Sequence, residues 1–181
     1  MIYLFRISER QPRIVRPDQV QLSGKRAGNG RRTVKRILLT GMSGVGKSAV
    51  LEKLAAEGFL CVDLDDCWMR EGQGERLINL EAVRRFVREH EAEPVLFAGC
   101  AANQGGLNAD YTILLTASPE TMRKRIAGRK NPFGKDGETW QKILADKEVT
   151  EPLLKAKCDM VINTEQALED TVRQIRQLLE E

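Results

Sequence analysis

Apolar residues beyond position 35 are concentrated in five short runs, each about as long as one β-strand. The runs are nearly continuous rather than alternating, which is typical of strands that are covered on both faces of a parallel sheet. They are RILLT (36–40), FLCVDLDD (59–66), PVLFAG (94–99), YTILLTA (111–117) and DMVINT (159–164). We therefore expect five buried strands.

Apolar residues in the stretches between these runs lie three or four positions apart, which is the spacing of one helix face. Gly58 stands where a helix-terminating glycine belongs, Asn79 is expected to cap a helix, and Ser118 precedes proline and glutamate as helix starts often do. The predicted helices cover 47–58, 80–90, the segment after Ser118, the region around 140–144, and 168–179. Five alternations of strand and helix predict an α/β domain of three layers with a five-stranded parallel sheet.

A glycine-rich segment, GMSGVGKS (41–48), joins the first predicted strand to the first predicted helix. It fills every fixed position of the pattern G-x-x-x-x-G-K-[ST]. Glycines let successive backbone N–H groups turn inward around an anion, and the helix adds the positive end of its dipole. In this pattern the lysine reaches the β- and γ-phosphates and the serine hydroxyl binds Mg²⁺. The predicted ligands of ATP are Gly41, Met42, Ser43, Gly44, Val45, Gly46, Lys47, Ser48 and Ala49, with Ser48 also on the metal.

Two carboxylates lie in VDLDD (62–66), at the end of the second predicted strand. Residues two apart in a strand share a face, so Asp63 and Asp65 are expected to point the same way beside the glycine loop. There they could hold a metal-bound water and the hydroxyl of a phosphoryl acceptor. The alternative is a solvated acidic turn that caps the next helix.

A basic loop, GRKNPFGKDG (128–137), follows the helix that begins after Ser118. Phosphoryl transfer depends on positioning and on neutralising charge, and a lid of Arg and Lys side chains over the phosphates would supply both. Arg125 and Arg129 lie four apart on one helix face and are the predicted catalytic arginines. A charged surface loop is the alternative. The neighbouring basic residues are Lys130 and Lys135, which are further candidates, and Arg123 and Lys124, which are expected to be a solvated helix face.

The chain lacks the sequence motifs that mark several other classes of protein. The base-reading N/T-K-x-D motif of GTPases is absent, and the strand over 95–99 is not followed by the Asp of large ATPases. His90 is the only histidine, which leaves little for Ser/His/Asp or Cys/His catalysis. Four cysteines without a CxxC pair disfavour a zinc site or a disulfide framework and favour a reducing cytoplasm.

Four segments resemble small P-loop kinases of the shikimate kinase and gluconate kinase type, within the wider nucleoside monophosphate kinase fold. They are GMSGVGKS, GFLCVDLDD, FAGC (97–100) and RIAGRKNPFGK (125–135), so the resemblance covers about 36–180. It implies an adenylate/shikimate kinase-like P-loop NTPase fold, in which Asp63 supports Mg²⁺ and Asp65 holds the acceptor hydroxyl. In shikimate kinases a glycine-rich loop after the third strand contacts the substrate carboxylate. Here only Gly99 of GCAANQGG (99–106) matches that loop directly. As a whole, the chain also resembles AAA-type ATP-binding proteins of bacteria.

Positive charge is concentrated in the first 36 residues, which carry ten Lys/Arg against two Asp/Glu, while the remainder has a net charge of −5. Together with its prolines and glycines, this predicts a flexible basic extension over 1–33, followed by a P-loop kinase domain over 34–181. The extension is interpreted as a leader without a specific role, an arm for nucleic acid or an anionic surface, or a transit peptide.

Taken together, these features predict an ATP- and Mg²⁺-dependent kinase that phosphorylates a hydroxyl of a small-molecule metabolite. A nucleoside monophosphate kinase and an ATP-binding regulatory protein with little turnover are the alternatives. We expect a cytoplasmic monomer or homodimer. No apolar run approaches the roughly 18 residues that span a membrane, and nucleic acid is disfavoured as a partner because only the extension is basic.

Overall fold

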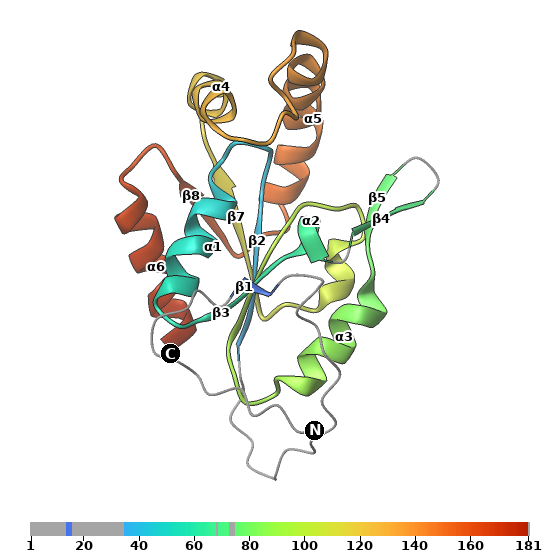
Figure 1. The fold of residues 1–181 in the computed structure, drawn as a ribbon, viewed down its shortest axis with the longest axis vertical. Coiled ribbons are helices and arrows are strands. Elements are labelled where there is room, and N and C mark those ends of the chain that lie inside the picture. Colours follow the sequence, from blue (N-terminus) through green and yellow to red (C-terminus); the bar gives the residue numbers. More distant parts are fainter. Residues whose placement is uncertain (1–13, 16–34, 68, 73–74, 181) are drawn as a thin grey trace.

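A parallel sheet runs through the middle of the protein, in a computed structural model that describes residues 14–15, 35–67, 69–72 and 75–180 (Figure 1). Its strands, in spatial order, are β1 (Ile14–Val15), β3 (Leu60–Asp63), β6 (Val95–Ala98), β2 (Arg36–Thr40), β7 (Tyr111–Thr116) and β8 (Met160–Asn163). Every neighbouring pair is parallel. The predicted five-stranded parallel sheet is confirmed, and the two-residue strand β1 extends it beside β3.

Helices cover both faces of this sheet, so the predicted three-layer α/β fold is confirmed (Figure 1). Helices α1 (Lys47–Ala56) and α6 (Leu168–Glu180) pack together on one face, and α3 (Leu80–Glu89) lies on the other. Helices α4 (Pro119–Gly128) and α5 (Gly137–Lys155) stand beyond the carboxyl ends of the strands, at the top of Figure 1.

Strand side chains alternate between two apolar cores, one on each face of the sheet. In β2, Ile37 and Leu39 pack with residues of α1 and α6, whereas Leu38 packs with residues of α3. All three side chains are at most 2% exposed. This burial on both faces explains why the strands appear in the sequence as continuous apolar runs rather than as alternating ones.

The predicted starts of α3 and α4 are confirmed, because the capping residues make the expected contacts. The Asn79 side chain accepts a hydrogen bond from the Ala82 N–H, and the Ser118 side chain accepts one from the Thr121 N–H. Gly58 follows α1 with a φ of +96°, a conformation that glycine adopts without strain. These local signals fixed where the helices begin and end.

The predicted strand over 59–66 is wrong beyond Asp63, where the chain turns into the short helix α2 (Leu64–Cys67). The Asp63 Oδ1 atom accepts a hydrogen bond from the Asp65 N–H at 3.0 Å. Such a local bond competes with strand pairing and starts a turn. The antiparallel hairpin of β4 (Met69–Gly72) and β5 (Glu75–Ile78), which follows α2, was not predicted.

The predicted boundary between an extension over 1–33 and a domain over 34–181 stays a prediction. Apart from Ile14–Val15, which form β1, the residues of the extension lie outside the described part of the chain. Among the described residues, no helix combines the length and the apolar composition needed to cross a bilayer.

Candidate active site

The glycine loop, residues 41–46, connects β2 to α1 at the carboxyl edge of the sheet. Gly41, Gly44 and Gly46 have φ angles of +138°, +90° and +104°, which side chains rarely allow. A Cβ atom at position 41 would lie 2.4 Å from the Leu115 backbone oxygen, and one at position 44 would lie 3.0 Å from the Met122 oxygen. The loop conformation therefore requires glycine at these positions, including position 44, which the sequence pattern leaves free.

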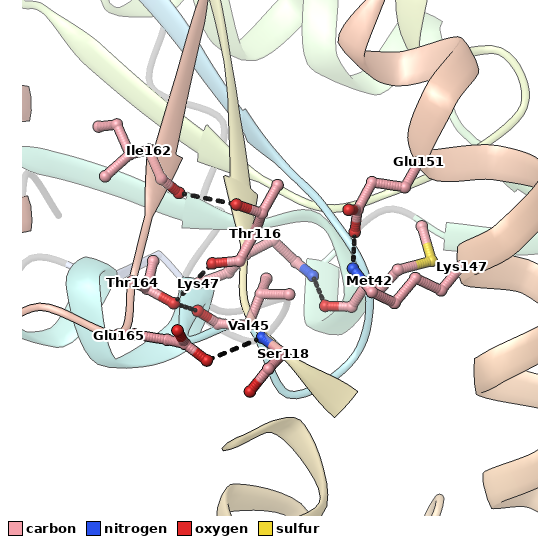
Figure 2. Close-up of polar contacts among 10 residues, drawn as sticks. All are labelled: Met42, Val45, Lys47, Thr116, Ser118, Lys147, Glu151, Ile162, Thr164 and Glu165. Carbon is pink, nitrogen blue, oxygen red and sulfur yellow. Dashed lines mark hydrogen bonds and ion pairs between the residues drawn. The ribbon is translucent and has the colours of Figure 1, made fainter. Parts of the chain in front are cut away.

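Lys47 folds its side chain back over the first half of the loop. Its Nζ atom donates hydrogen bonds to the backbone oxygens of Gly41 at 2.6 Å and Met42 at 3.1 Å (Figure 2 shows the second). In a planar trans peptide the C=O and N–H groups point in opposite directions, so holding these two oxygens also fixes the N–H groups of Met42 and Ser43. Lys47 thus orders the same loop whose bound phosphates the sequence predicts it to contact.

Several ionisable groups surround the Lys47 ammonium. Burial lowers its pKa, the neighbouring Arg129 guanidinium lowers it further, and Cys100, Asp65 and Asp63 act in the opposite direction. Both carboxylates therefore lie close enough to Lys47 to stabilise its charge. Asp63 is half-buried at the end of β3, and Asp65 is exposed in α2, so they reach this region from different elements rather than from one strand face.

Arg129, which follows α4 directly, contacts the same loop from the basic loop of residues 128–137. Its Nη2 atom donates to the Ser43 Oγ atom at 3.2 Å and to the Phe133 backbone oxygen at 2.6 Å. Its Nε atom is buried and has no hydrogen-bond partner within the described part of the chain. Burial lowers the pKa of the guanidinium. An N–H group in this situation is available to an anion.

Arg125 lies on α4, four residues before Arg129, and its described contacts are with the protein itself. The predicted common helix face of the two arginines is wrong, because α4 ends at Gly128 and the backbone of Arg129 is extended. Its Nη1 atom donates to the Val45 backbone oxygen at 3.1 Å and to the Thr164 Oγ1 atom at 2.9 Å. Its Nη2 atom donates to the Thr164 backbone oxygen at 2.6 Å. The two predicted catalytic arginines thus contact different parts of the glycine loop, and of the two it is Arg129 that has a buried nitrogen without a hydrogen-bond partner among the described residues.

The basic loop is held in place by Arg123, which the sequence analysis assigned to a solvated helix face. That prediction is wrong, because Arg123 is half-buried, donates to the Gly134 oxygen at 2.7 Å and lies 5.2 Å from the centre of the Trp140 ring. Lys124, one position further, is exposed as expected. The apolar neighbour Trp140 explains why one of two adjacent basic residues is covered.

Mg²⁺ has suitable protein ligands beside the loop. Ser48 is an exposed hydroxyl in the first turn of α1, and the Asp63 carboxylate lies near Lys47. No group of three or more His, Cys, Asp or Glu side chains that could hold a metal occurs in the described residues. Mg²⁺ does not need one, because it commonly uses one or two protein ligands together with substrate phosphates and water.

The loop after β6 contains polar residues that the sequence analysis did not assign. Thr40, which immediately precedes the glycine loop, is fully buried and donates to the Gln104 Oε1 atom at 3.0 Å. The Asn103 side chain exchanges two hydrogen bonds of 2.9 Å with the backbone of Ile78. These amides tie the loop over 99–106 to β2 and β5. Their position after a strand, at the same sheet edge, is the signal that could have identified them.

Comparison with known proteins gives one family match and several relatives. Residues 37–143 match the family model AAA_18, described as an AAA domain. The chain is 32% identical over 124 residues to a Pyrococcus furiosus protein named "Putative adenylate kinase", covering 65% of this chain and 68% of that protein. It is 28% identical over 147 residues to a "Nucleotide-binding protein" of Acidiphilium cryptum, covering 79% of this chain and 48% of that protein. The chain therefore spans about half the length of the nucleotide-binding proteins that it matches.

Solved structures of kinases share the fold. A shikimate kinase from Acinetobacter baumannii in complex with shikimate superposes with a TM-score of 0.55 at 21% identity, covering 81% of this chain and 93% of that chain. A deoxyadenosine kinase from M. mycoides with bound dATP gives a TM-score of 0.52 at 16% identity, covering 81% of this chain and 100% of that chain. The predicted resemblance to small P-loop kinases is confirmed at the level of the fold. Because the family model matches more than half of its residues, the protein belongs to the AAA domain family AAA_18 and has the P-loop kinase fold.

Proposed function

We propose that the protein transfers the γ-phosphoryl group of ATP to a hydroxyl of a small-molecule metabolite. The observation that carries the proposal is the convergence of Lys47 and Arg129 on one glycine loop. The positive charges of Lys47 and Arg129 repel each other, and the buried Arg129 Nε atom has no hydrogen-bond partner among the described residues. A triphosphate on the loop would neutralise both charges and accept from this N–H group.

The residues around the loop have complementary roles in this proposal. Backbone N–H groups of the loop hold the phosphates, while Lys47 and Arg129 neutralise the charge that spreads over the transferring group. Ser48 and Asp63 would hold Mg²⁺, which when bound neutralises phosphate charge. Asp65 accepts a hydrogen bond from the acceptor hydroxyl and orients its oxygen toward the γ-phosphorus. The new P–O bond forms as the bond to the bridging oxygen breaks, ADP leaves, and the proton of the acceptor hydroxyl passes to the Asp65 carboxylate.

A nucleoside monophosphate kinase is the second candidate, and the relatives named "Putative adenylate kinase" favour it. In that case the acceptor is a phosphate oxygen of a nucleotide rather than a metabolite hydroxyl. The same loop, Lys47 and Arg129 would serve either reaction. AMP and other nucleoside monophosphates therefore belong in the set of acceptors tested.

The direct test is ADP release from Mg·ATP in the presence of individual acceptors. The set includes shikimate, gluconate, nucleosides and nucleoside monophosphates, with Lys47→Ala as the blank. An acceptor that raises the rate at least tenfold over ATP alone, and not in the variant, supports a kinase and identifies its substrate class. ATP consumption that no acceptor changes would instead indicate an NTP hydrolase and would contradict the proposal.

Arg129→Lys is expected to lower kcat by about 100-fold, because lysine cannot replace the guanidinium N–H groups that are offered to the γ-phosphate. Affinity for Mg·ADP, which lacks that phosphate, should change less than threefold. Steady-state kinetics and calorimetric titration with ADP measure the two effects, and Lys124→Ala is the control on an exposed residue of α4. An equal loss of ADP affinity and of kcat would assign Arg129 to the shape of the loop instead of the γ-phosphate.

Asp65→Asn is expected to lower acceptor-dependent turnover by about 100-fold while ATP affinity stays within a factor of two. The amide keeps the size of the side chain but weakens its hydrogen bond to the acceptor hydroxyl. Asp110→Asn is the control. Asp110 is also an exposed aspartate, but it accepts a hydrogen bond from the Arg36 backbone N–H and lies 45 residues after Asp65 in the sequence. Unchanged turnover in Asp65→Asn would remove this residue from the mechanism.

A further inference from the structure

We infer that Arg125 and Thr164 are positioning residues, which hold the Val45 carbonyl so that the adjoining Gly46 N–H group is directed at the bound phosphates. The inference rests on the proposed binding of nucleotide to the glycine loop. It gives Arg125 a different role from Arg129, although the two arginines lie four residues apart and the sequence presents them as equivalent.

The second half of the glycine loop is held through one backbone oxygen. The Val45 oxygen accepts hydrogen bonds from the Thr164 hydroxyl at 2.8 Å and from the Arg125 Nη1 atom at 3.1 Å (Figure 2 shows the first). None of the described peptide bonds is cis. The N–H group of Gly46 therefore points away from Thr164 and Arg125. Gly46 is also the N-cap of α1, where the helix dipole favours an anion.

Thr164 is well suited to hold this oxygen, because it is itself fixed to the sheet. It is 6% exposed, its backbone N–H donates to the Thr116 oxygen at 2.9 Å, and its hydroxyl lies 3.1 Å from the same oxygen. A hydroxyl has one proton, so it donates to Val45 or to Thr116 at any moment. The Arg125 N–H group ensures that the Val45 oxygen always has a donor.

Most of the N–H groups of Arg125 are used by the protein itself. Its two terminal nitrogens make three hydrogen bonds to protein oxygens, two of them to Thr164. The guanidinium also packs against the loop, since a Cβ atom at Gly46 would lie 3.6 Å from its Nη1 atom. Three of the five N–H donors of the Arg125 guanidinium are thus committed to the protein, whereas the buried Nε–H group of Arg129 has no hydrogen-bond partner among the described residues. The contacts thus separate a residue that shapes the loop from one that meets the ligand.

The complementary first half of the loop is ordered by Lys47, which holds the oxygens of Gly41 and Met42. Because Lys47 holds the first half of the loop and Arg125 and Thr164 hold the second, the N–H groups of the loop are oriented before nucleotide binds. A preorganised site avoids the free-energy cost of ordering the backbone on binding. Loss of the Val45 contacts should therefore weaken the binding of every nucleotide that uses the loop, whatever its number of phosphates.

Calorimetric titration with Mg·ADP and with the non-hydrolysable analogue Mg·AMPPNP tests the inference without any acceptor. Thr164→Val removes the hydroxyl at nearly constant volume and is expected to weaken both ligands by the same factor, about tenfold. Thr164→Ser keeps the hydroxyl and should restore affinity to within a factor of two. Arg125→Lys should also weaken both ligands equally, whereas Arg129→Lys should weaken AMPPNP more than ADP.

Two control variants accompany these measurements. Thr116→Val removes a hydroxyl that donates to the Ile162 oxygen at 3.5 Å, and Lys124→Ala removes an exposed charge from α4. Wild-type affinity in Thr164→Val with a lowered melting temperature would overturn the inference, since the contact would then be structural only. Selective loss of AMPPNP binding in Arg125→Lys would overturn it too, by making Arg125 a γ-phosphate ligand. If the wild type binds neither nucleotide, it is the proposed function that fails.

Discussion

Replacement of Lys47 by methionine is expected to lower acceptor-dependent turnover by at least about 100-fold. The ammonium has two tasks in this protein. It holds the Gly41 and Met42 oxygens, which orients the first half of the glycine loop, and it supplies positive charge beside Arg129 where the transferring phosphoryl group is proposed to lie. Methionine keeps an unbranched apolar side chain of similar length but removes both the hydrogen bonds and the charge.

Lys53→Met is the matched control for this variant, because Lys53 lies on the same helix but forms an exposed ion pair with Glu169 at 3.7 Å. Such surface pairs contribute little, so its kinetics and melting temperature should stay near those of the wild type. Steady-state kinetics with Mg·ATP and a productive acceptor measures both variants. Turnover in Lys47→Met above about a tenth of the wild-type rate would contradict the assigned role.

Gly41→Ala is expected to abolish nucleotide binding and to destabilise the protein by about 3 kcal/mol or more. The added methyl group would lie 2.4 Å from the Leu115 backbone oxygen, and the residue has a φ of +138°. Either β7 or the loop would have to move, and the loop holds the phosphates. Thermal unfolding and calorimetric titration with Mg·ADP measure the two losses.

Gly58→Ala separates the effect of backbone conformation from that of the steric clash. Gly58 also has a positive φ, of +96°, but a Cβ atom there would meet nothing within 4 Å. This variant should cost only about 1–2 kcal/mol and leave nucleotide affinity unchanged. Equal destabilisation in the two variants, with ADP binding retained in Gly41→Ala, would show that the close approach to Leu115 does not constrain the loop.

The sequence was most informative where one local interaction determines the structure. Continuous apolar runs identified the five strands because both sheet faces are buried, and Asn79 and Ser118 identified helix starts because each caps its own helix. The glycine loop could be located for the same reason. Its conformation depends on positive φ angles that glycine adopts readily, and those glycines are visible in the sequence.

The sequence was least informative where contacts join distant segments. The two-residue spacing predicts a common strand face for Asp63 and Asp65, but a hydrogen bond between these two residues ends the strand and places Asp65 in a helix. Spacing alone also made Arg125 and Arg129 equivalent. The difference depends on Thr164, which is 39 residues beyond Arg125 and lies directly after β8, the strand that pairs with β7. Periodicity carries no information about such partners.

The most direct test of the central claim, phosphoryl transfer from ATP to an acceptor, is a ³¹P NMR time course. The wild-type protein is mixed with Mg·ATP and a pool of the candidate acceptors, and the fate of the γ-phosphorus is followed. The account predicts that a new phosphate-ester resonance, or that of a nucleoside diphosphate formed from an added monophosphate, grows in step with ADP and is absent with Lys47→Met. Release of inorganic phosphate alone, at the same rate with and without the acceptors, would contradict it.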